Sequence, residues 1–428
     1  MRVLVVGGGG REHALAWAWH RDAPADDIVV APGNGGTAAF AVNVAVDVTD
    51  AAAVARCAGE REVDIVVIGP DAAAAAGVGD ACAAAGIAVF GPSAAAARIE
   101  SSKVFAKQVM QRAGIPTAGW VAGDATEKDR LRDFVHAHGG RCVVKADGLA
   151  LGKGVVVCDT VDDALQALAA CLDERRFGSA GGTVVVEQRL DGVELSVFGL
   201  SDGERVRVLP PARDHKRAFD GDKGPNTGGM GAVSPPPDHG IDALVDSVQA
   251  TVLQPCVDAL REMGCPFVGC LYAGLMLTAD GPRVLEFNAR FGDPEAQVVL
   301  PLMGEPLPAL LTAAAHAALK AGTVARRNGA CAGVVAAAAG YPGSVHTGAE
   351  ITGLETLDDS VLCFHAGTRI AADGRLRTAG GRVLCLVAHR ESLHDATQDV
   401  YANLGRVRFD GMWYRHDIGA TGLAALRS

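Results

Sequence analysis

The sequence predicts an α/β protein whose first part is built on a parallel sheet. Short aliphatic runs alternate with alanine-rich helical stretches over about the first 93 residues, which is typical of parallel strands joined through helices. Hydrophobic residues make up 49% of the chain and aromatic residues only 5%, a composition that favours helices packed closely on sheets. Because 428 residues exceed one ordinary core, about two to four domains are expected.

Charge and cysteine content exclude several classes of function. The net charge of −11 and the absence of basic runs argue against nucleic-acid binding. The 11 cysteines are scattered without a C-x-x-C pair, as expected of reduced thiols in a cytosolic protein. The chain opens on a strand rather than a signal peptide, and no apolar run is long enough to span a bilayer. We therefore predict a cytoplasmic protein that acts on small molecules, without nucleic-acid, membrane or obligate protein partners.

The first strand, Val3–Val6, runs into four glycines and then a helix over residues 14–20. Free backbone N–H groups and the helix dipole converge at such a turn and favour an anion. A second strand, Ile28–Val30, ends in another glycine-rich turn, but no acid stands there to hold a ribose as in a dinucleotide site. We therefore predict the phosphate of a ligand other than NAD, while plain tight turns remain an alternative for the second loop.

Two more strands, at residues 64–68 and 87–90, each end in a Gly-Pro pair. The carboxyl ends of parallel strands meet at one edge of the sheet, so ligands are expected to bind at that edge. A helix is predicted to start within residues 101–107.

A strand at residues 141–145 ends in a lysine and leads into a glycine-rich loop before the next strand. The loop lacks the G-x-x-x-x-G-K-[ST] pattern of a P-loop. Its glycines and flanking lysines exceed what a simple turn needs, and we predict that it folds over a triphosphate. A structural hairpin is the alternative. The residues concerned are Lys145, Gly148, Gly152, Lys153 and Gly154.

Two acids, Glu187 and Glu194, lie at the end of a strand at residues 184–187 and just beyond it. They are either solvated charges or, beside a nucleotide, acceptors for an exocyclic amine or ribose hydroxyls. The glycine-dense polar stretch 214–231 follows. We predict that residues 221–231 form no regular element and have a functional role, because long loops of this kind usually do.

The stretch Val284–Glu295 carries the strongest chemical signal. A strand there would place Glu286, Asn288 and Arg290 on one row, with Asp293 just beyond its end. Carboxylate and amide oxygens suit Mg²⁺, and arginine suits a carboxylate or phosphate. The alternative is a strand with a solvated polar face. This strand should pair with residues 268–277 through a hairpin across Asp280-Gly281. Short strands after residue 325 predict a separate, mostly structural C-terminal unit.

These stretches, in order and along essentially the whole chain, resemble the glycinamide ribonucleotide synthetases, or phosphoribosylamine–glycine ligases, of the ATP-grasp superfamily. The motifs that carry the resemblance are Gly9–Ala14, Ala31–Asn34, Lys145–Ala150, Gly152–Val155, Asp214–Arg217, Gly224–Gly231, Glu286–Asn288, Arg290–Glu295, Phe364–Thr368, Gly380–Leu384 and Tyr414–Gly419. The chain departs from the family at Asp71, where Gly69-Pro70-Asp71-Ala72-Ala73-Ala74 replaces the usual Gly-Pro-Glu-Ala-Pro-Leu.

The resemblance implies a multidomain α/β fold. An N-terminal Rossmann-like (pre-ATP-grasp) domain with a parallel sheet would span residues 1–100. An ATP-grasp domain of two subdomains would span 101–325, with its lid at about 118–190. A small α+β domain would span 326–428.

The resemblance also implies roles for individual residues. The residues expected to contact the phosphates of ATP are Lys103, Lys145 and the lid residues Gly148, Gly152, Lys153 and Gly154. Glu187 and Glu194 would lie near adenine and ribose. The metal, Mg²⁺ or Mn²⁺, would be held by Glu286 and Asn288. Arg290 and Asp293 would hold glycine, with Asp214 and Lys216 near the reacting centre. Those for 5-phosphoribosylamine are Gly10, Arg11, Glu12, Asn34, Asp71 and Asn226.

The activity that the resemblance implies is the ATP-dependent joining of glycine to 5-phosphoribosylamine in purine biosynthesis. The reaction would pass through glycyl phosphate and yield glycinamide ribonucleotide, ADP and phosphate. Three alternatives stay open: another ATP-grasp enzyme such as a carboxylase or a different amino-acid ligase, a nucleotide-binding protein that has lost catalysis, and, more distantly, a NAD oxidoreductase.

Overall fold

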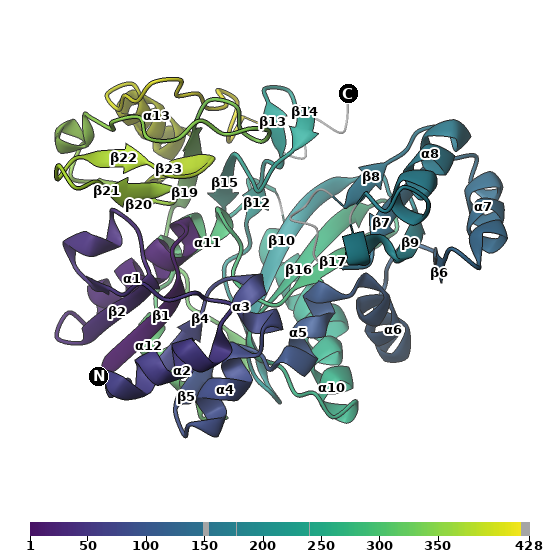
Figure 1. Cartoon of the computed structure of the whole chain (residues 1–428), viewed down its shortest axis with the longest axis horizontal. Helices are drawn as coiled ribbons and strands as arrows, with labels where there is room; N and C mark the ends of the chain where they lie inside the picture. Colours follow the sequence, from purple (N-terminus) through teal and green to yellow (C-terminus); the bar gives the residue numbers. More distant parts are fainter. Residues whose placement is uncertain (149–153, 177, 239, 421–428) are drawn as a thin grey trace.

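The computed structural model describes residues 1–148, 154–176, 178–238 and 240–420. Gly152 and Lys153, which are predicted to contact phosphate, lie outside the described residues. Figure 1 shows the N-terminal sheet and the C-terminal sheet on one side of the molecule, a central sheet in the middle and a small α/β lid on the far side. Within the described ranges, no helix is long and apolar enough to cross a membrane. The 11 cysteines are free, and all except Cys363 are buried.

The N-terminal part is a parallel sheet, as predicted, and its strand order is β3-β2-β1-β4-β5. Its strands alternate their buried side chains between two cores, so both faces are covered by helices. The strands are β1 (Arg2–Gly7), β2 (Asp27–Pro32), β3 (Val42–Asn43), β4 (Ile65–Ile68) and β5 (Ala88–Phe90). The helices are α1 (Gly10–Asp22), α2 (Ala51–Glu60), α3 (Asp71–Ala75), α4 (Val78–Ala84) and α5 (Ala94–Ser101).

The central sheet has the order β17-β16-β10-β11-β18 and is antiparallel except at β18. The predicted hairpin is present, with Thr278 paired to Gly281. The strands are β10 (Val193–Asp202), β11 (Val206–Val208), β16 (Val268–Thr278), β17 (Gly281–Asn288) and β18 (Gly322–Thr323). The helices around it are α6 (Lys103–Ala113), α9 (Ile241–Val248), α10 (Gln254–Glu262) and α12 (Leu307–Ala315). The short helix α11 (Glu295–Val299) packs between α1 and the C-terminal sheet.

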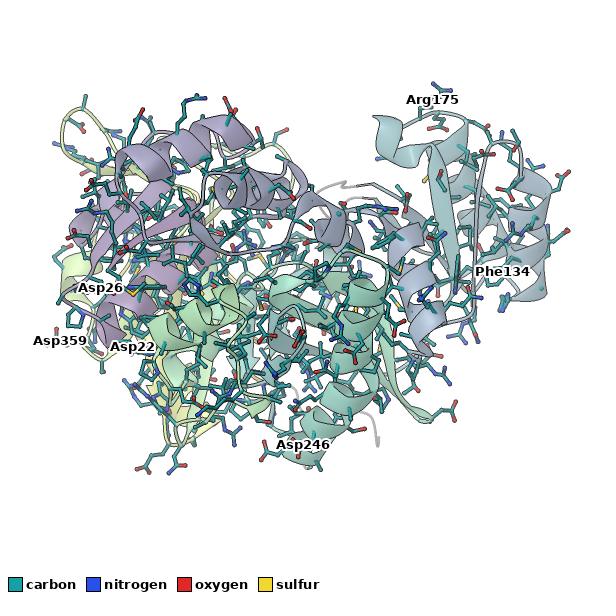
Figure 2. All side chains as sticks on the ribbon, turned by 90° about the horizontal axis from the view of Figure 1, so that it is seen from below. Asp22, Asp26, Phe134, Arg175, Asp246 and Asp359 are labelled. Carbon is teal, nitrogen blue, oxygen red and sulfur yellow. The ribbon has the colours of Figure 1, made fainter. Side chains whose placement is uncertain are left out.

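The lid is an antiparallel sheet of order β6-β9-β7-β8 with two helices and a hydrophobic core of its own. In Figure 2 the lid, marked by Phe134 and Arg175, stands apart from the body that carries Asp22 and Asp26. Its strands are β6 (Trp120–Asp124), β7 (Cys142–Ala146), β8 (Val155–Val157) and β9 (Thr183–Gln188), and its helices are α7 (Lys128–Ala137) and α8 (Val161–Leu172).

The C-terminal sheet has the order β12-β15-β19-β23-β20, and the chain after residue 325 does not form it alone. Two strands from the middle of the chain extend it, because β15 pairs antiparallel with β19 and β12 pairs with β15. The elements are β12 (Arg213–Asp214), β15 (Gly231–Ser234), β19 (Ala330–Ala337), β20 (Val361–His365), β21 (Thr368–Ile370), β22 (Leu376–Thr378), β23 (Arg382–Arg390) and α13 (Leu393–Leu404).

The prediction that residues 221–231 form no regular element was also wrong. They contain the second strand of a hairpin, β13 (Arg217–Phe219) with β14 (Lys223–Asn226), and the start of β15. The turn between the two hairpin strands needs left-handed backbone, and Gly221 (φ 70°) and Asp222 (φ 53°) supply it. Gly221 therefore allows the tight turn of a hairpin and does not prevent regular structure.

Candidate active site

Strand β17 carries an ionised carboxylate at the centre of the candidate site. The Glu286 side chain is 41% exposed, and its Oε1 lies 3.9 Å from Lys216 Nζ. Burial acts to raise the pKa of Glu286, but Lys216, Lys145 and Lys103 outweigh it and hold the pKa below the usual value. Glu286 therefore presents a charged carboxylate to three lysines that lie far apart in the sequence.

Strand β17 ends at Asn288, so Arg290 does not continue the predicted strand row. Arg290 nevertheless lies beside the end of β17, because its Nη2 donates to Asn288 Oδ1 at 3.2 Å and lies 3.0 Å from Glu100 Oε1. Glu100 also accepts the Ala289 N–H at 2.8 Å. Nothing in the alanine-rich stretch around Glu100 indicated this contact with the segment after β17.

The pair Glu286 and Asn288 fits a hard divalent cation. The carboxylate is ionised, and the Asn288 amide oxygen retains a lone pair beyond the one that Arg290 uses. No group of three or more His, Cys, Asp or Glu side chains is placed to hold a metal in the described parts of the chain. Phosphate oxygens and water would therefore complete the shell, which is the usual way that Mg²⁺ is bound.

Two predicted phosphate lysines approach this strand from the lid side. Lys145 on β7 donates to Leu285 O at 2.9 Å, which is the residue before Glu286. Lys103 opens α6, and its Nζ donates to Gly148 O at 3.4 Å. Burial lowers the pKa of Lys103, opposed by Glu286 and reinforced by Lys145. A cationic surface thus faces the carboxylate of Glu286.

Asp147 fixes the start of the glycine-rich loop and was not predicted. It accepts the Val104 N–H at 2.8 Å and the Ser102 hydroxyl at 3.1 Å. Ser102 also caps α6 by accepting the Phe105 N–H. The Asp147 carboxylate therefore joins the base of the loop to the helix that carries Lys103. A serine just before a helix indicates a cap, but nothing in the sequence indicated that Ser102 would also bond to Asp147.

The two acids predicted near adenine and ribose have different surroundings. Glu194 on β10 is 42% exposed and pairs with Lys216 at 2.7 Å. The Glu187 side chain is only 3% exposed and faces Lys107 at 3.2 Å and Lys145 at 2.9 Å. Contact of either acid with a nucleotide stays a prediction. In this structure the Glu187 carboxylate forms ion pairs with two lysines.

Asp214 and Lys216 lie together where β12 meets the central sheet. Burial raises the pKa of Asp214 to about 8, with Glu295, Glu194 and Glu286 adding to the effect against the opposing charge of Lys216. Behind them, Tyr272 OH donates to Glu295 Oε1 at 2.8 Å and lies 2.8 Å from Ser196 Oγ. Sequence reasoning missed this buried network, although Glu295 closes a motif that was recognised.

Arg11 and Glu12 are buried and paired with each other. Glu12 Oε1 accepts from Arg11 Nε at 2.5 Å, and Oε2 accepts the Gly9 N–H at 2.7 Å. A Cβ at Gly69 would collide with the Glu12 carboxyl group. Position 69, in the loop beside Glu12, therefore requires glycine. Arg11 also donates to Phe291 O at 3.3 Å. These side chains hold the first glycine loop in place, and their predicted contact with 5-phosphoribosylamine stays a prediction.

Asn34 is likewise bonded to backbone. Its amide donates to Gly8 O at 3.1 Å and to His365 O at 2.8 Å, and its oxygen accepts the Gly36 N–H at 2.9 Å. The remaining predicted contacts with 5-phosphoribosylamine lie in three places. Gly10 begins α1 beside Gln297 and Asp293, Asp71 begins α3 near Arg290 and Glu100, and Asn226 is exposed at the end of β14.

Asp293 lies where the three sheets of the body meet. Arg382, from β23 of the C-terminal sheet, lies 3.1 Å from Asp293 Oδ2 and donates to Asp293 O at 2.6 Å and Gly228 O at 2.5 Å. Gln297 donates to Asp293 Oδ1 at 2.8 Å. The C-terminal sheet therefore supplies a cation to Asp293, a contact that was not predicted. The motif Gly380–Leu384 contained this signal, but no role was assigned to its arginine.

Three family models match the chain and together cover most of it. They are the phosphoribosylglycinamide synthetase N domain (residues 1–100), ATP-grasp (A) domain (residues 101–296) and C domain (residues 331–421). A phosphoribosylamine–glycine ligase of Streptomyces coelicolor is 48% identical over 99% of this chain and 100% of its own length. One of Halalkalibacterium halodurans is 45% identical over 99% and 98%.

Other relatives are longer. The human trifunctional purine biosynthetic protein adenosine-3 is 44% identical over 100% of this chain, which spans only 42% of that protein. A crystal structure of a Thermotoga maritima phosphoribosylamine–glycine ligase has a TM-score of 0.83 and 32% identity, covering 98% of this chain and 100% of that one. A biotin carboxylase domain of Hydrogenobacter thermophilus shares the fold, with a TM-score of 0.73 at 17% identity over 96% of this chain and 91% of its own. The chain therefore belongs to the phosphoribosylglycinamide synthetase family.

Proposed function

We propose that this protein ligates glycine to 5-phosphoribosylamine with ATP, giving glycinamide ribonucleotide, ADP and phosphate. The observation that carries the proposal is the full-length match to relatives named phosphoribosylamine–glycine ligase. The arrangement of charge supports it, because Lys103, Lys145 and Lys216 surround the ionised Glu286. Such an arrangement suits a metal-bound triphosphate beside an amino-acid carboxylate.

The reaction has two steps in this proposal. A glycine carboxylate oxygen attacks the γ-phosphorus of ATP, which forms glycyl phosphate and releases ADP. The amine of 5-phosphoribosylamine then attacks the carbonyl carbon, the C–O bond to phosphate breaks, and the nitrogen loses a proton. Activation is needed because a carboxylate has no good leaving group, whereas an acyl phosphate does.

The side chains of this chain would orient the reactants and balance their charge. Lys103 and Lys145 take the nucleotide phosphates, and Arg290 and Asp293 hold glycine by its carboxylate and ammonium groups. Lys216 offsets charge that builds up on the phosphoryl group. The Asp214 carboxyl group beside it, with its raised pKa of about 8, can exchange a proton near neutral pH.

Glu286 and Asn288 would hold the divalent cation, Mg²⁺ or Mn²⁺. When bound, the cation neutralises phosphate charge during phosphoryl transfer. Water must be kept from the acyl phosphate, and we assign this role to the glycine-rich segment from Gly148 to Gly154, of which residues 149–153 lie outside the described residues. Asp147 fixes one end of that loop to α6 through Val104 and Ser102.

The test is ADP release in the presence of glycine and Mg²⁺, with and without freshly generated 5-phosphoribosylamine. We expect rapid release only when both substrates are present, together with glycinamide ribonucleotide detected by mass spectrometry. Bicarbonate in place of glycine is the matched control, because the fold is shared with biotin carboxylase domains. Release that follows bicarbonate, or no dependence on the amine, would refute the proposal.

A further inference from the structure

A closed chain of four side chains connects the lid to the strand that carries Glu286. Thr117 donates to Val284 O at 2.6 Å, and Lys107 donates to Thr117 Oγ1 at 2.7 Å. Lys107 then faces Glu187, Glu187 faces Lys145, and Lys145 donates to Leu285 O at 2.9 Å. The chain thus begins and ends on consecutive carbonyl groups of β17, immediately before Glu286.

Lys107 cannot itself touch a ligand in this arrangement. Its side chain is 2% exposed, and its ammonium group lies 3.2 Å from Glu187 Oε2 and 2.7 Å from Thr117 Oγ1. Lys145 differs, because its partner Glu187 Oε1 accepts no aligned hydrogen bond from any described residue although the two atoms are 2.9 Å apart. The Lys145 ammonium group therefore donates to Leu285 O and faces Glu187 without an aligned hydrogen bond, which leaves two of its three N–H donors for an anion.

We propose that Lys107 is a positioning residue that, through Glu187, keeps the Lys145 ammonium group available to nucleotide phosphates. The inference rests on the proposed function, in which Lys145 contacts ATP. A buried carboxylate needs positive charge nearby. With Lys107 present, the Glu187 charge is shared between two lysines; without it, Lys145 alone must balance Glu187 and competes poorly for phosphate.

The test compares a ligand that has phosphates with one that has none. Lys107→Met keeps the length of the side chain and removes its charge. We expect the Kd for ATP to rise about tenfold, since a charge lost near a buried pair is worth about that factor. The Kd for adenosine, measured by displacement of a fluorescent nucleotide, should rise by a clearly smaller factor, because adenosine has no phosphate for Lys145 and would sense the substitution only through the Glu187 carboxylate that is predicted near adenine.

Lys128→Met is the matched control, because it removes the same charge from the lid at a surface pair with Asp173. Thr117→Val removes the hydroxyl that anchors Lys107 while keeping its shape, and it should give a smaller change in the same direction. This second variant decides the question if Lys107→Met does not fold, which a thermal melt reveals.

Two results would overturn the inference. One is a Kd for ATP that is unchanged from that of the native protein in folded Lys107→Met and Thr117→Val. The other is an equal loss of affinity for ATP and adenosine, which would mean that the four side chains only hold the lid in place. A native protein that binds no ATP would instead refute the proposed function and this inference with it, so the two failures are told apart.

Discussion

The region around Glu286 and the first glycine loop contain similar residue types but use them differently. Glu286, Glu194 and Lys216 are all partly exposed, and among the described residues the nearest ion-pair partner of Glu286 is Lys216 at 3.9 Å. Arg11 and Glu12 are almost fully buried and paired with each other and with backbone. The comparison teaches that charge left accessible in one region is available to ligands, whereas charge satisfied in the other fixes the backbone at Gly9 and at Phe291.

The sharpest way to break this comparison is to remove the accessible carboxylate. Glu286→Ala should lower kcat by about a thousandfold or more, because it removes the charged ligand of the proposed cation. The melting temperature should hardly change, since the side chain makes no close hydrogen bond. Glu262→Ala, at an exposed pair on α10, is the control and should keep native activity. A Glu286→Ala variant with near-native turnover would exclude the metal role.

The buried acid should show the opposite pattern. Glu12→Gln removes the charge that faces Arg11 and weakens the bond to Gly9 N–H, so we expect a loss of about 2–4 kcal/mol in the free energy of unfolding. Urea denaturation measures it, with Glu62→Gln as the control because that side chain is 90% exposed. If the variant keeps native stability but loses affinity for 5-phosphoribosylamine, Glu12 belongs with the accessible group instead.

The sequence predicted the elements that depend on local patterns and missed contacts between residues far apart in the chain. Periodic apolar runs predicted the parallel sheet and the β16–β17 hairpin, because local patterns decide those elements. The position of Asn34 at a turn could be read, but its bond to His365 O spans most of the chain and has no local signature. The pairing of Glu187 with Lys107 is of the same kind.

The C-terminal sheet shows where local reasoning failed. Its strands after residue 325 were predicted, whereas β12 and β15, which join it from the middle of the chain, were not. Strand pairing depends on tertiary contacts that composition does not encode. The contact of Arg382 with Asp293 likewise joins residues that are far apart in the sequence. Likewise, β17 ends at Asn288 and leaves Arg290 beyond it, a boundary that residue types alone place poorly.

A smaller effect is expected where accessible and buried groups meet. Arg382→Met leaves Asp293 without its cation and frees the Gly228 carbonyl, so kcat/KM for glycine should fall about 30-fold, because a misplaced substrate-binding group is costly. The Kd for ATP should stay native, since Arg382 lies away from the lid lysines. Arg375→Met, at an exposed pair with Glu350, is the control. An unchanged kcat/KM would show that the C-terminal sheet only supports the fold.

The smallest expected effect concerns pH and the contact between the N-terminal loop and the C-terminal sheet. His13 is buried, and its Nδ1 accepts the His365 N–H at 2.8 Å, which requires neutral imidazole. Burial, with a further contribution from His365, lowers the pKa of His13 to about 3. The unfolded chain binds a proton at its ordinary pKa of about 6.5, so stability is complete above that pH and is lost as pH falls toward 3.

The expected size between pH 7 and 5.5 is about 1 kcal/mol, because over that range the unfolded histidine takes up most of a proton and the folded one takes up almost none. Urea denaturation of the native chain and of His13→Asn measures it. The asparagine oxygen can accept the same N–H but does not titrate, so the variant should lose about 1 kcal/mol less over this range. Equal slopes for the two proteins would mean that His13 is solvated, and that the first glycine loop is less tightly closed against the C-terminal sheet than its contacts indicate.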